Sequence, residues 1–301
     1  KKAAAKNGGK LRLVYQYGAG LEGVDHDAAR EHGVCVARIP AELSGNGVST
    51  AEHALFLLLG LLRRYSLSQK QMLEERRLGA PIGITLKGKR VVLLGFGSIG
   101  REAAIRLKAF GATVIGIRQG PWAQADLELI DEKATSLHEG VRGADALIVC
   151  CPLTDSTRGV VNAELIRDNG KPLHLVNVAR GGVVDMDSVL DGLGSGSLEG
   201  FAADVFPQEP FLSRVDDPTN EAGGVGPLLG LQKKGANVFL TPHLGGVTDV
   251  SYGGMARIFS ENVLEFFGER NSGGAGDDRS RWWERPEDGA VTVPPPEEWL
   301  R

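Results

Sequence analysis

Three side chains suited to acid–base chemistry on a small carboxylic acid each follow a short apolar stretch of the chain. They are Arg180, Glu209 and His243. The stretches that precede them are predicted strands, at 173–179, 200–206 and 237–241. Because ligands of a parallel sheet bind beyond the carboxyl ends of its strands, we expect the three side chains to lie at one edge.

The three residue types match the needs of hydride transfer to a 2-oxo acid. An arginine such as Arg180 holds a carboxylate with two parallel hydrogen bonds. His243 titrates in the range useful for a proton donor, and a carboxylate such as Glu209 beside it would raise its pKa and orient its ring. Taken singly, each has an ordinary alternative: a salt-bridged Arg, a surface Glu and a His in a turn. Their occurrence together, in this order, favours a catalytic site.

A glycine motif precedes these residues and predicts where a cofactor binds. Gly95, Gly97 and Gly100 follow the apolar stretch 91–94 and open a predicted helix at 101–110. Gly95 permits a tight turn, Gly97 lets the backbone approach a pyrophosphate, and Gly100 lets the helix and the strand pack closely. The helix N-terminus then offers N–H groups to the phosphates. A plain glycine-rich turn is the alternative, which the strand–turn–helix context disfavours.

Arg118 follows the second strand of this part, at 113–117. An acidic residue near this position would bind the adenosine ribose, whereas an arginine favours a 2′-phosphate. The chain is therefore expected to use NAD(P), with a preference for NADP. A solvated surface arginine remains the alternative.

The elements around these residues alternate between strand and helix. Six predicted strands, joined largely by helices, indicate an α/β fold with a doubly wound parallel sheet of the Rossmann type, and they lie at 91–94, 113–117, 146–151, 173–179, 200–206 and 237–241. The connecting stretch 126–138 is predicted to contain a polar helical segment. The glycine-containing stretch 223–235 is predicted to lengthen a loop between Glu209 and His243.

The beginning of the chain predicts a smaller, incomplete unit. Strands at 11–15 and 34–36 flank a short helix capped by Asp25. Two strands do not form an independent core, so this is expected to be an N-terminally truncated α/β substrate domain. A long helix from Ser49 or Thr50 to about residue 75 is apolar nearly all round, which suits a seam between domains.

These patterns predict four parts. Residues 1–74 form the remnant of the substrate domain and the inter-domain helix, 75–243 the NAD(P)-binding domain, and 244–270 a returning helix. Residues 271–301, rich in Gly, Pro and charge, are expected to be a disordered tail.

Composition limits the classes of partner. A net charge of −4 gives no support for nucleic-acid binding. The longest apolar stretch, 54–62, is too short to span a membrane. The three cysteines are expected to be buried thiols in a reducing compartment, with no metal ligand set. The location expected is the cytoplasm or an organellar stroma or matrix. The chain starts with Lys rather than Met, so a targeting segment could precede it.

At these motifs the chain resembles the D-isomer-specific 2-hydroxyacid dehydrogenase family. The resemblance runs from about residue 11 to 268 and is carried by YGAGLEGVD (17–25), STAEHALFLLLGLLRR (49–64), VVLLGFGSIGREAAIRLKAFGATVIG (91–116), CPLTDSTRGVVN (151–162), VNVARGGVVD (176–185), AADVFPQEP (202–210) and TPHLGG (241–246).

The resemblance implies a nucleotide-binding domain inserted in a smaller substrate domain, homodimers, and a catalytic Arg, Glu and His. These roles fall on Arg180, Glu209 and His243. The backbone at Ala19 and Gly20 is expected to meet the substrate carboxylate, together with Arg180 and His243. The implied cofactor-binding residues, among which Asp204 lies near the nicotinamide carboxamide, are Gly95, Gly97, Ser98, Ile99, Gly100, Arg118, Cys151, Pro152, Thr157, Ala179, Arg180, Asp204 and His243.

The expected activity is reduction of a small 2-oxo acid, such as glyoxylate or hydroxypyruvate, to the D-2-hydroxy acid, or the reverse. Formate dehydrogenases of this family pair their His with Gln, so Glu209 argues against that branch. A nucleotide-sensing interaction protein of the corepressor type, without useful turnover, is the alternative from another class. A third interpretation is that the stretch given is too short to work while the full protein is active.

Overall fold

The computed structural model describes residues 11–21, 23–207, 209 and 225–267. It divides the chain into two compact units, residues 1–47 with 248–301, and residues 48–247. The sequence placed the boundaries at 74/75 and 243/244 instead, so residues 48–74 lie in the larger unit rather than with the beginning of the chain. The predicted tail at 271–301 lies outside the described residues.

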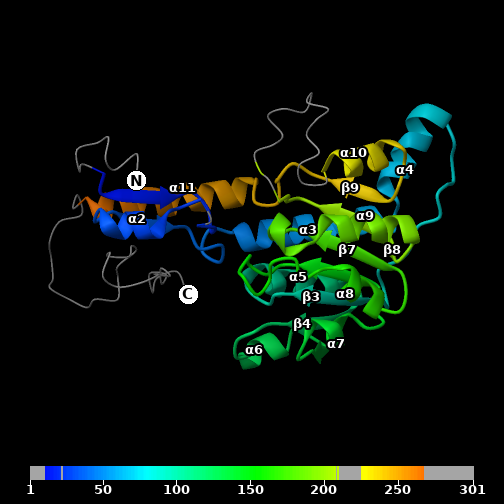
Figure 1. The fold of residues 1–301 in the computed structure, drawn as a ribbon, viewed down its shortest axis with the longest axis horizontal. Helices are drawn as coiled ribbons and strands as arrows, with labels where there is room; N and C mark the ends of the chain where they lie inside the picture. The colour runs from blue at the N-terminus through cyan, green and yellow to red at the C-terminus, as the bar shows by residue number, and fades with distance from the viewer. Residues whose placement is uncertain (1–10, 22, 208, 210–224, 268–301) are drawn as a thin grey trace. The chain divides into compact units, whose positions relative to one another are not determined.

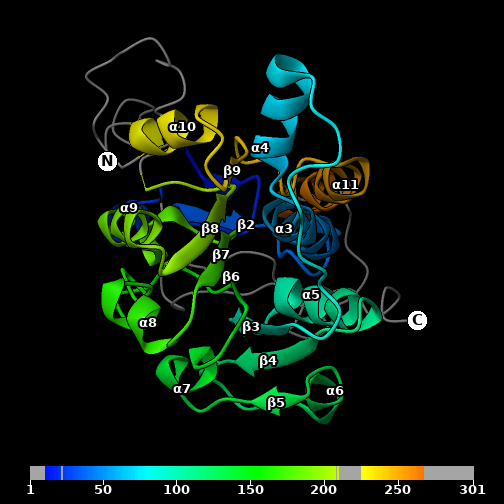
Figure 2. The same cartoon turned by 90° about the vertical axis from the view of Figure 1, so that its right-hand side faces the viewer.

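The larger unit contains a parallel sheet of seven strands in the order β5-β4-β3-β6-β7-β8-β9, in which Figure 1 labels β3, β4, β7, β8 and β9 and Figure 2 labels all seven. Their bounds are β3 Arg90–Leu94, β4 Thr113–Ile117, β5 Glu132–Lys133, β6 Ala146–Val149, β7 Leu173–Asn177, β8 Leu198–Ala203 and β9 Val238–Leu240. The chain winds outward from β3 to β5 and then from β6 to β9, so the direction reverses between β3 and β6. This confirms the doubly wound α/β fold, in which such a switch point opens a ligand crevice.

Helices cover both faces of this sheet. Figure 2 shows α7, α8 and α9 on one face and α3 and α5 on the other. The helices of this unit are α3 Asn46–Leu62, α4 Tyr65–Lys70, α5 Ser98–Ala109, α6 Gln124–Leu127, α7 Leu137–Val141, α8 Ala163–Asp168, α9 Met186–Ser195 and α10 Val225–Lys233, with short π- and 3₁₀-helical turns at Gln71–Glu75 and Gly181–Val183.

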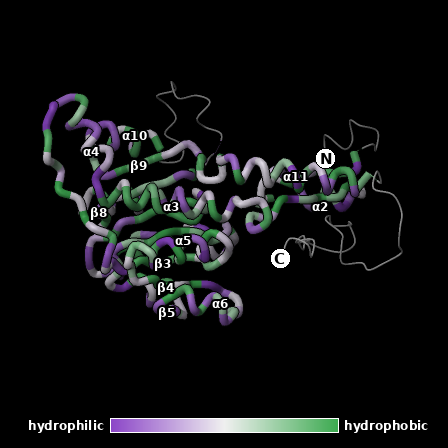
Figure 3. The backbone as a smooth tube through the Cα atoms, turned by 180° about the vertical axis from the view of Figure 1, so that it is seen from behind, coloured by the Kyte–Doolittle hydropathy of each residue, from purple (hydrophilic) through white to green (hydrophobic). Residues whose placement is uncertain are grey.

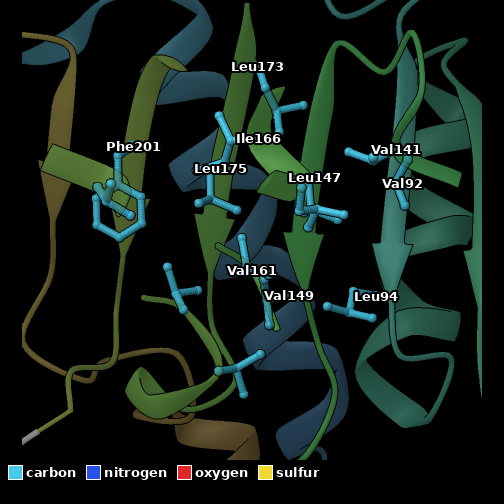
Figure 4. Close-up of a cluster of buried hydrophobic side chains, with 14 of the residues drawn as sticks. Val92, Leu94, Val141, Leu147, Val149, Val161, Ile166, Leu173, Leu175 and Phe201 are labelled. Carbon is cyan, nitrogen blue, oxygen red and sulfur yellow. The ribbon is translucent and has the colours of Figure 1, made fainter. Parts of the chain in front are cut away.

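Two apolar layers hold the sheet between these helices. One contains Leu147, Leu175 and Phe201, all fully buried (Figure 4). The other contains Leu57 from α3 and Leu93 from β3. Strands buried on both faces are expected to be almost wholly apolar, and the path through β3 is indeed hydrophobic (Figure 3).

The predicted long helix is not continuous. It begins at Asn46, and α3 ends at Leu62, because Arg64 takes a left-handed backbone conformation with φ 50°. Another left-handed residue, Arg76 at φ 52°, follows the π-helical turn that succeeds α4. The expectation of one helix to about residue 75 was therefore wrong, since side-chain periodicity does not report such backbone breaks.

Two further expectations are corrected. Within 126–138 helix occurs only at the two ends, in α6 and α7. Between them lies the edge strand β5, and the residues on either side of it, Asp131 and Ala134, donate backbone hydrogen bonds to β4. The stretch 223–235 is not a plain loop, because α10 occupies Val225–Lys233 and buries Leu228 completely. In both places tertiary pairing overrides the local pattern.

The smaller unit pairs two parallel strands, β1 Leu13–Gln16 and β2 Cys35–Arg38, around α2 His26–Glu31. Asp25 caps α2 as predicted, accepting a hydrogen bond from the Ala28 N–H at 2.9 Å. The helix α11 Asp249–Phe266 packs on this pair, and the Tyr15 hydroxyl accepts a hydrogen bond from Asn262 at 2.6 Å. Across the part of the chain that the structure describes, no helix is long and apolar enough to cross a membrane.

Candidate active site

The glycine turn after β3 has the geometry that the motif predicts. Gly95 takes φ 101°, and a Cβ there would lie 2.6 Å from the Cys151 nitrogen. A Cβ on Gly100 would lie 2.4 Å from the Gly95 carbonyl oxygen, so only glycine permits this approach of helix and strand. At Gly97 a Cβ would meet nothing within 4 Å, which leaves room above the backbone. Gly97 makes no side-chain cap, and α5 begins at Ser98, so the turn suits a pyrophosphate at a helix N-terminus.

Arg118, at the end of β4, is held by a buried carboxylate rather than solvated. Its Nη1 donates to Asp126 Oδ2 at 2.8 Å, and Arg101 donates to both oxygens of the same carboxylate. The hydrogen bond from Arg101 and the charges of both arginines outweigh the effect of burial and hold the pKa of Asp126 below its usual range. Sequence reasoning singled out Arg118 but missed its partner Asp126.

The backbone of the loop after β6 lies next to the glycine turn. The Cys150 N–H donates to the Leu94 carbonyl at 2.8 Å. Burial raises the pKa of the Cys151 thiol to about 11, and burial also raises that of Cys150, so neither is a thiolate near neutral pH. Thr157 turns inward, and its hydroxyl donates to the Pro152 carbonyl at 2.7 Å, which fixes the loop.

The loop after β7 carries Arg180 and is fastened by Asn177. The amide of this fully buried side chain donates to the Arg180 carbonyl at 3.0 Å and accepts from the Ala179 N–H at 3.1 Å. Gly181 then approaches the next loop so closely that a Cβ would lie 1.9 Å from the Phe206 carbonyl carbon. The loops after β7 and β8 are thereby brought together. Sequence reasoning missed Asn177, whose only signal was a polar residue ending an apolar strand.

Glu209 and His243 meet, although 34 positions separate them. His243 Nδ1 lies 2.6 Å from Glu209 Oε2, while Glu209 Oε1 accepts from the Phe206 N–H at 2.9 Å. An ionised carboxylate only accepts hydrogen bonds, so Nδ1 carries a proton and Nε2 is the atom left to act on a ligand. His243 takes φ 55°, a left-handed conformation uncommon for non-glycine residues and frequent at functional sites.

The electrostatics of the pair favour a charged imidazolium. The hydrogen bond to Glu209 raises the pKa of His243, against the opposing effect of burial, and the charges of Glu209 and Asp204 act in the same direction. Burial alone would raise the pKa of Glu209, but hydrogen bonds from His243 and Phe206 outweigh it, and the pKa lies below its usual value. The charge of Arg180 contributes to both, lowering each pKa.

Asp204, at the end of β8, fastens the turn that carries His243. Its buried carboxylate accepts from the Thr241 hydroxyl at 2.6 Å and from the N–H groups of Leu244 at 2.8 Å and Gly245 at 2.7 Å. His53 of α3 adds a contact at 3.2 Å. These hydrogen bonds outweigh burial and keep the pKa of Asp204 below its usual value. Sequence reasoning placed Asp204 at the cofactor and missed this fastening role.

The structure thus brings together the residues after three adjacent strands, Arg180 after β7, Glu209 after β8 and His243 after β9. The predicted substrate contacts Ala19 and Gly20 belong to the smaller unit. There the Ala19 carbonyl accepts a hydrogen bond from Arg38 at 3.1 Å. Their role toward a substrate stays a prediction.

Comparison with known proteins places this arrangement in a family. Residues 55–245 match the D-isomer specific 2-hydroxyacid dehydrogenase NAD binding domain. A glyoxylate reductase from Pyrococcus furiosus is 31% identical over 269 residues, which cover 87% of this chain and 74% of that protein. A D-3-phosphoglycerate dehydrogenase from Bacillus subtilis is 34% identical over 261 residues, covering 85% and 45%. The chain therefore belongs to the D-isomer specific 2-hydroxyacid dehydrogenase family.

Solved structures agree with this assignment. An NADPH-dependent glyoxylate/hydroxypyruvate reductase from Sinorhizobium meliloti, in complex with NADP and malonate, superposes with a TM-score of 0.71 at 29% identity, covering 86% of this chain and 75% of that one. A D-lactate dehydrogenase from Aquifex aeolicus, complexed with NAD and lactic acid, gives 0.78 at 25% identity, covering 89% and 80%. The chain spans less than half the length of two curated relatives, 45% of the Bacillus protein and 38% of a chloroplastic D-3-phosphoglycerate dehydrogenase 2 from Arabidopsis thaliana.

Proposed function

We propose that this protein is an NAD(P)-dependent oxidoreductase that reduces a small 2-oxo acid to the D-2-hydroxy acid, or catalyses the reverse. The observation that carries the proposal is the hydrogen-bonded pair of His243 and Glu209, whose Nδ1 and Oε2 atoms lie 2.6 Å apart. The pair forms beyond the ends of β8 and β9, and β8 is the neighbour of β7, which precedes Arg180. Surface salt bridges are common, but a histidine kept charged by a carboxylate at this edge of a doubly wound sheet suits proton donation to a ligand.

Each residue of the trio has a defined part in this reaction. The Arg180 guanidinium binds the substrate carboxylate with two hydrogen bonds and sets the position of the carbonyl. The reduced nicotinamide supplies a hydride to C2 of the substrate when it is bound. His243 Nε2 gives its proton to the carbonyl oxygen, and Glu209 holds the ring in place and favours its charged form. The half-exposed His243 then takes a proton from water, which completes the cycle.

The cofactor is proposed to lie along the carboxyl ends of β3 and β4, on the glycine turn, with its nicotinamide toward Ala179, Arg180 and His243. The open space at Gly97 and the uncapped start of α5 fit a pyrophosphate there. The preference for NADP rests on Arg118 alone. The descriptions of two structural relatives name different cofactors, NADP for the Sinorhizobium enzyme and NAD for the Aquifex enzyme.

The substrate is proposed to be of the size of glyoxylate or hydroxypyruvate. The descriptions of the Pyrococcus and Sinorhizobium relatives name these acids, and the Bacillus relative's description names 3-phosphoglycerate as an alternative. We further propose a homodimer. The segment after α4 exposes large apolar side chains that a second copy could cover, namely Met72, Leu73, Leu78 and Ile82.

The compartment is proposed to be the cytoplasm or an organellar stroma or matrix. All three cysteines are described, and none forms a disulfide, which is usual in reducing compartments. Two plant relatives carry the word chloroplastic in their names.

Oxidation of NADPH and NADH, followed at the nicotinamide absorbance with glyoxylate, hydroxypyruvate and larger 2-oxo acids, tests the proposal. We expect turnover that His243→Ala lowers by about 10²–10⁴-fold, the usual contribution of a general acid. Turnover unaffected by this substitution would contradict the assigned role. Cofactor binding without turnover, in this chain and in a longer one, would favour the nucleotide-sensing alternative.

A further inference from the structure

One buried carboxylate joins two arginines from separate parts of the proposed cofactor site. Asp126 has a side chain only 4% exposed, and its neighbours are Arg101 in the first turns of α5 and Arg118 at the end of β4. Arg101 contacts both carboxylate oxygens, whereas Arg118 contacts Oδ2 alone. The pair of arginines therefore already has an anion from the chain itself.

The setting of Arg118 shows that this arrangement is built into the fold. Its guanidinium carbon lies 5.9 Å from the centre of the Trp122 ring, within cation–π range. Trp122 in turn packs on Phe96, with ring centres 5.1 Å apart, and against Gly116, where a Cβ would lie 2.6 Å from the ring. Arg118 is thus held on one side by an aromatic ring and on another by a carboxylate.

The charges of this cluster weaken the preference for a cofactor that carries a 2′-phosphate. Two arginines and one ionised Asp126 leave a net charge of about +1, and the low pKa of Asp126 keeps it ionised near neutral pH. A phosphate on the ribose 2′ oxygen would meet Arg118, but it would also approach the carboxylate that Arg118 already contacts. The 2′-phosphate and the Asp126 carboxylate are both negative and repel each other, so part of the attraction of the phosphate to Arg118 is lost.

We propose that Asp126 is a specificity-determining residue that weakens, without abolishing, the preference for a 2′-phosphorylated dinucleotide that Arg118 gives. The inference rests on the proposed function for the position of the adenosine ribose. It goes beyond that proposal by assigning part of the selectivity between NAD and NADP to the Asp126 carboxylate. Asp126 acts through Arg118 and need not touch the cofactor.

The test uses two nucleotides that differ only in the 2′-phosphate, adenosine 2′,5′-bisphosphate and adenosine 5′-monophosphate, with binding to the 301-residue chain measured by calorimetry. In Asp126→Asn the amide keeps an acceptor for Arg118 but loses the charge. We expect affinity for the bisphosphate to rise about tenfold and affinity for the monophosphate to stay unchanged. In an Arg118→Ala background the gain should vanish, because the effect passes through Arg118.

The matched control is Asp131→Asn, another ion-paired carboxylate of the same sheet edge, which binds Lys108 and the Val114 N–H. It should change neither affinity. Should Asp126→Asn fail to fold, Arg101→Gln tests the same cluster in the opposite direction, since Asp126 would then be left to Arg118 and the bisphosphate should bind more weakly.

An unchanged ratio of the two affinities in the Asp126 and Arg101 variants would overturn the inference. So would an equal change for both nucleotides, which would mean that the pocket had been reshaped. Failure of the proposed cofactor site would give a different result from failure of this inference. In that case the unaltered chain would bind neither nucleotide.

Discussion

Replacing Glu209 by Gln removes the charge that faces His243 and keeps the shape of the side chain. In the wild-type chain the Glu209 carboxylate raises the pKa of His243, so the imidazole stays protonated to higher pH than usual. Reduction of a 2-oxo acid requires the protonated form. In Glu209→Gln the pKa of His243 falls, and the decline of kcat/KM for reduction on the alkaline side should move to lower pH.

The size of the effect follows from the geometry of the pair. A hydrogen bond to a charged group contributes about 1.5–3 kcal/mol. The His243 and Glu209 side chains are 52% and 35% exposed, so solvent weakens the pair and the lower end applies. Because about 1.4 kcal/mol corresponds to a factor of ten, kcat/KM for reduction near neutral pH should fall about tenfold.

The pH dependence of stability has a matching sign. The raised pKa of His243 means that its share of the pair's stabilisation is present at low pH and lost as pH rises through the folded-state pKa. The lowered pKa of Glu209 means that its share is present at higher pH and lost as pH falls through the folded-state value. The difference in unfolding free energy between wild type and Glu209→Gln should therefore be largest between these two values.

The assay is the pH profile of kcat/KM for reduction and for oxidation, with Glu199→Gln as the control. Glu199 also pairs with a cation, Arg64 at 2.7 Å, but at the far end of β8 from Asp204. The control should leave both profiles in place. Oxidation needs neutral His243, so Glu209→Gln should impair it less than reduction. If the alkaline limb stayed where it is in wild type, the proposed coupling between Glu209 and His243 would be refuted.

Three further predictions concern the remaining parts of the site. Arg118→Asp should shift the ratio of kcat/KM for the two cofactors toward NAD, and an unchanged ratio would contradict the inferred preference. Arg180→Lys should raise KM for the 2-oxo acid about tenfold or more, because Lys does not form the paired hydrogen bonds of a guanidinium; equal KM values would remove Arg180 from the substrate site. Gly100→Ala would place a Cβ 2.4 Å from the Gly95 carbonyl oxygen, so it should lower the unfolding free energy, measured by urea titration, by about 1–3 kcal/mol. Gly97→Ala has open space for its Cβ, so it should leave the unfolding free energy unchanged and weaken cofactor binding. Equal stability losses in the two glycine variants would show that the glycines do not have these separate roles.

The sheet and the edge that carries the site were predictable because they depend on strong local signals. A wholly apolar stretch such as 91–94, followed at once by spaced glycines, has few alternative structures. The order of Arg180, Glu209 and His243 behind successive strands was enough to place them at one edge. The chemistry proposed for them follows from their residue types.

The missed features depend on tertiary contacts that leave little trace in sequence. Asp126 looks like one acidic residue among several in a polar stretch, and only the fold brings it to Arg101 and Arg118. His53 lies at the start of an apolar helical stretch, and its contact with Asp204 spans 151 positions (204 − 53). Strand β5 has two exposed residues and exists because it pairs with β4. Such features arise from the fold and do not have a periodic pattern of their own.

The most direct test of the proposed activity follows the hydrogen atom itself. The reduced cofactor, carrying deuterium at both positions of C4 of the nicotinamide, is incubated with the protein and hydroxypyruvate, and the product is resolved by chiral chromatography and mass spectrometry. Hydride transfer to C2 predicts one deuterium at C2 of the D-2-hydroxy acid. The variant His243→Ala should form the same labelled product, in an amount reduced with its turnover. Formation of the L-enantiomer, or of a product without the label at C2, would contradict the account.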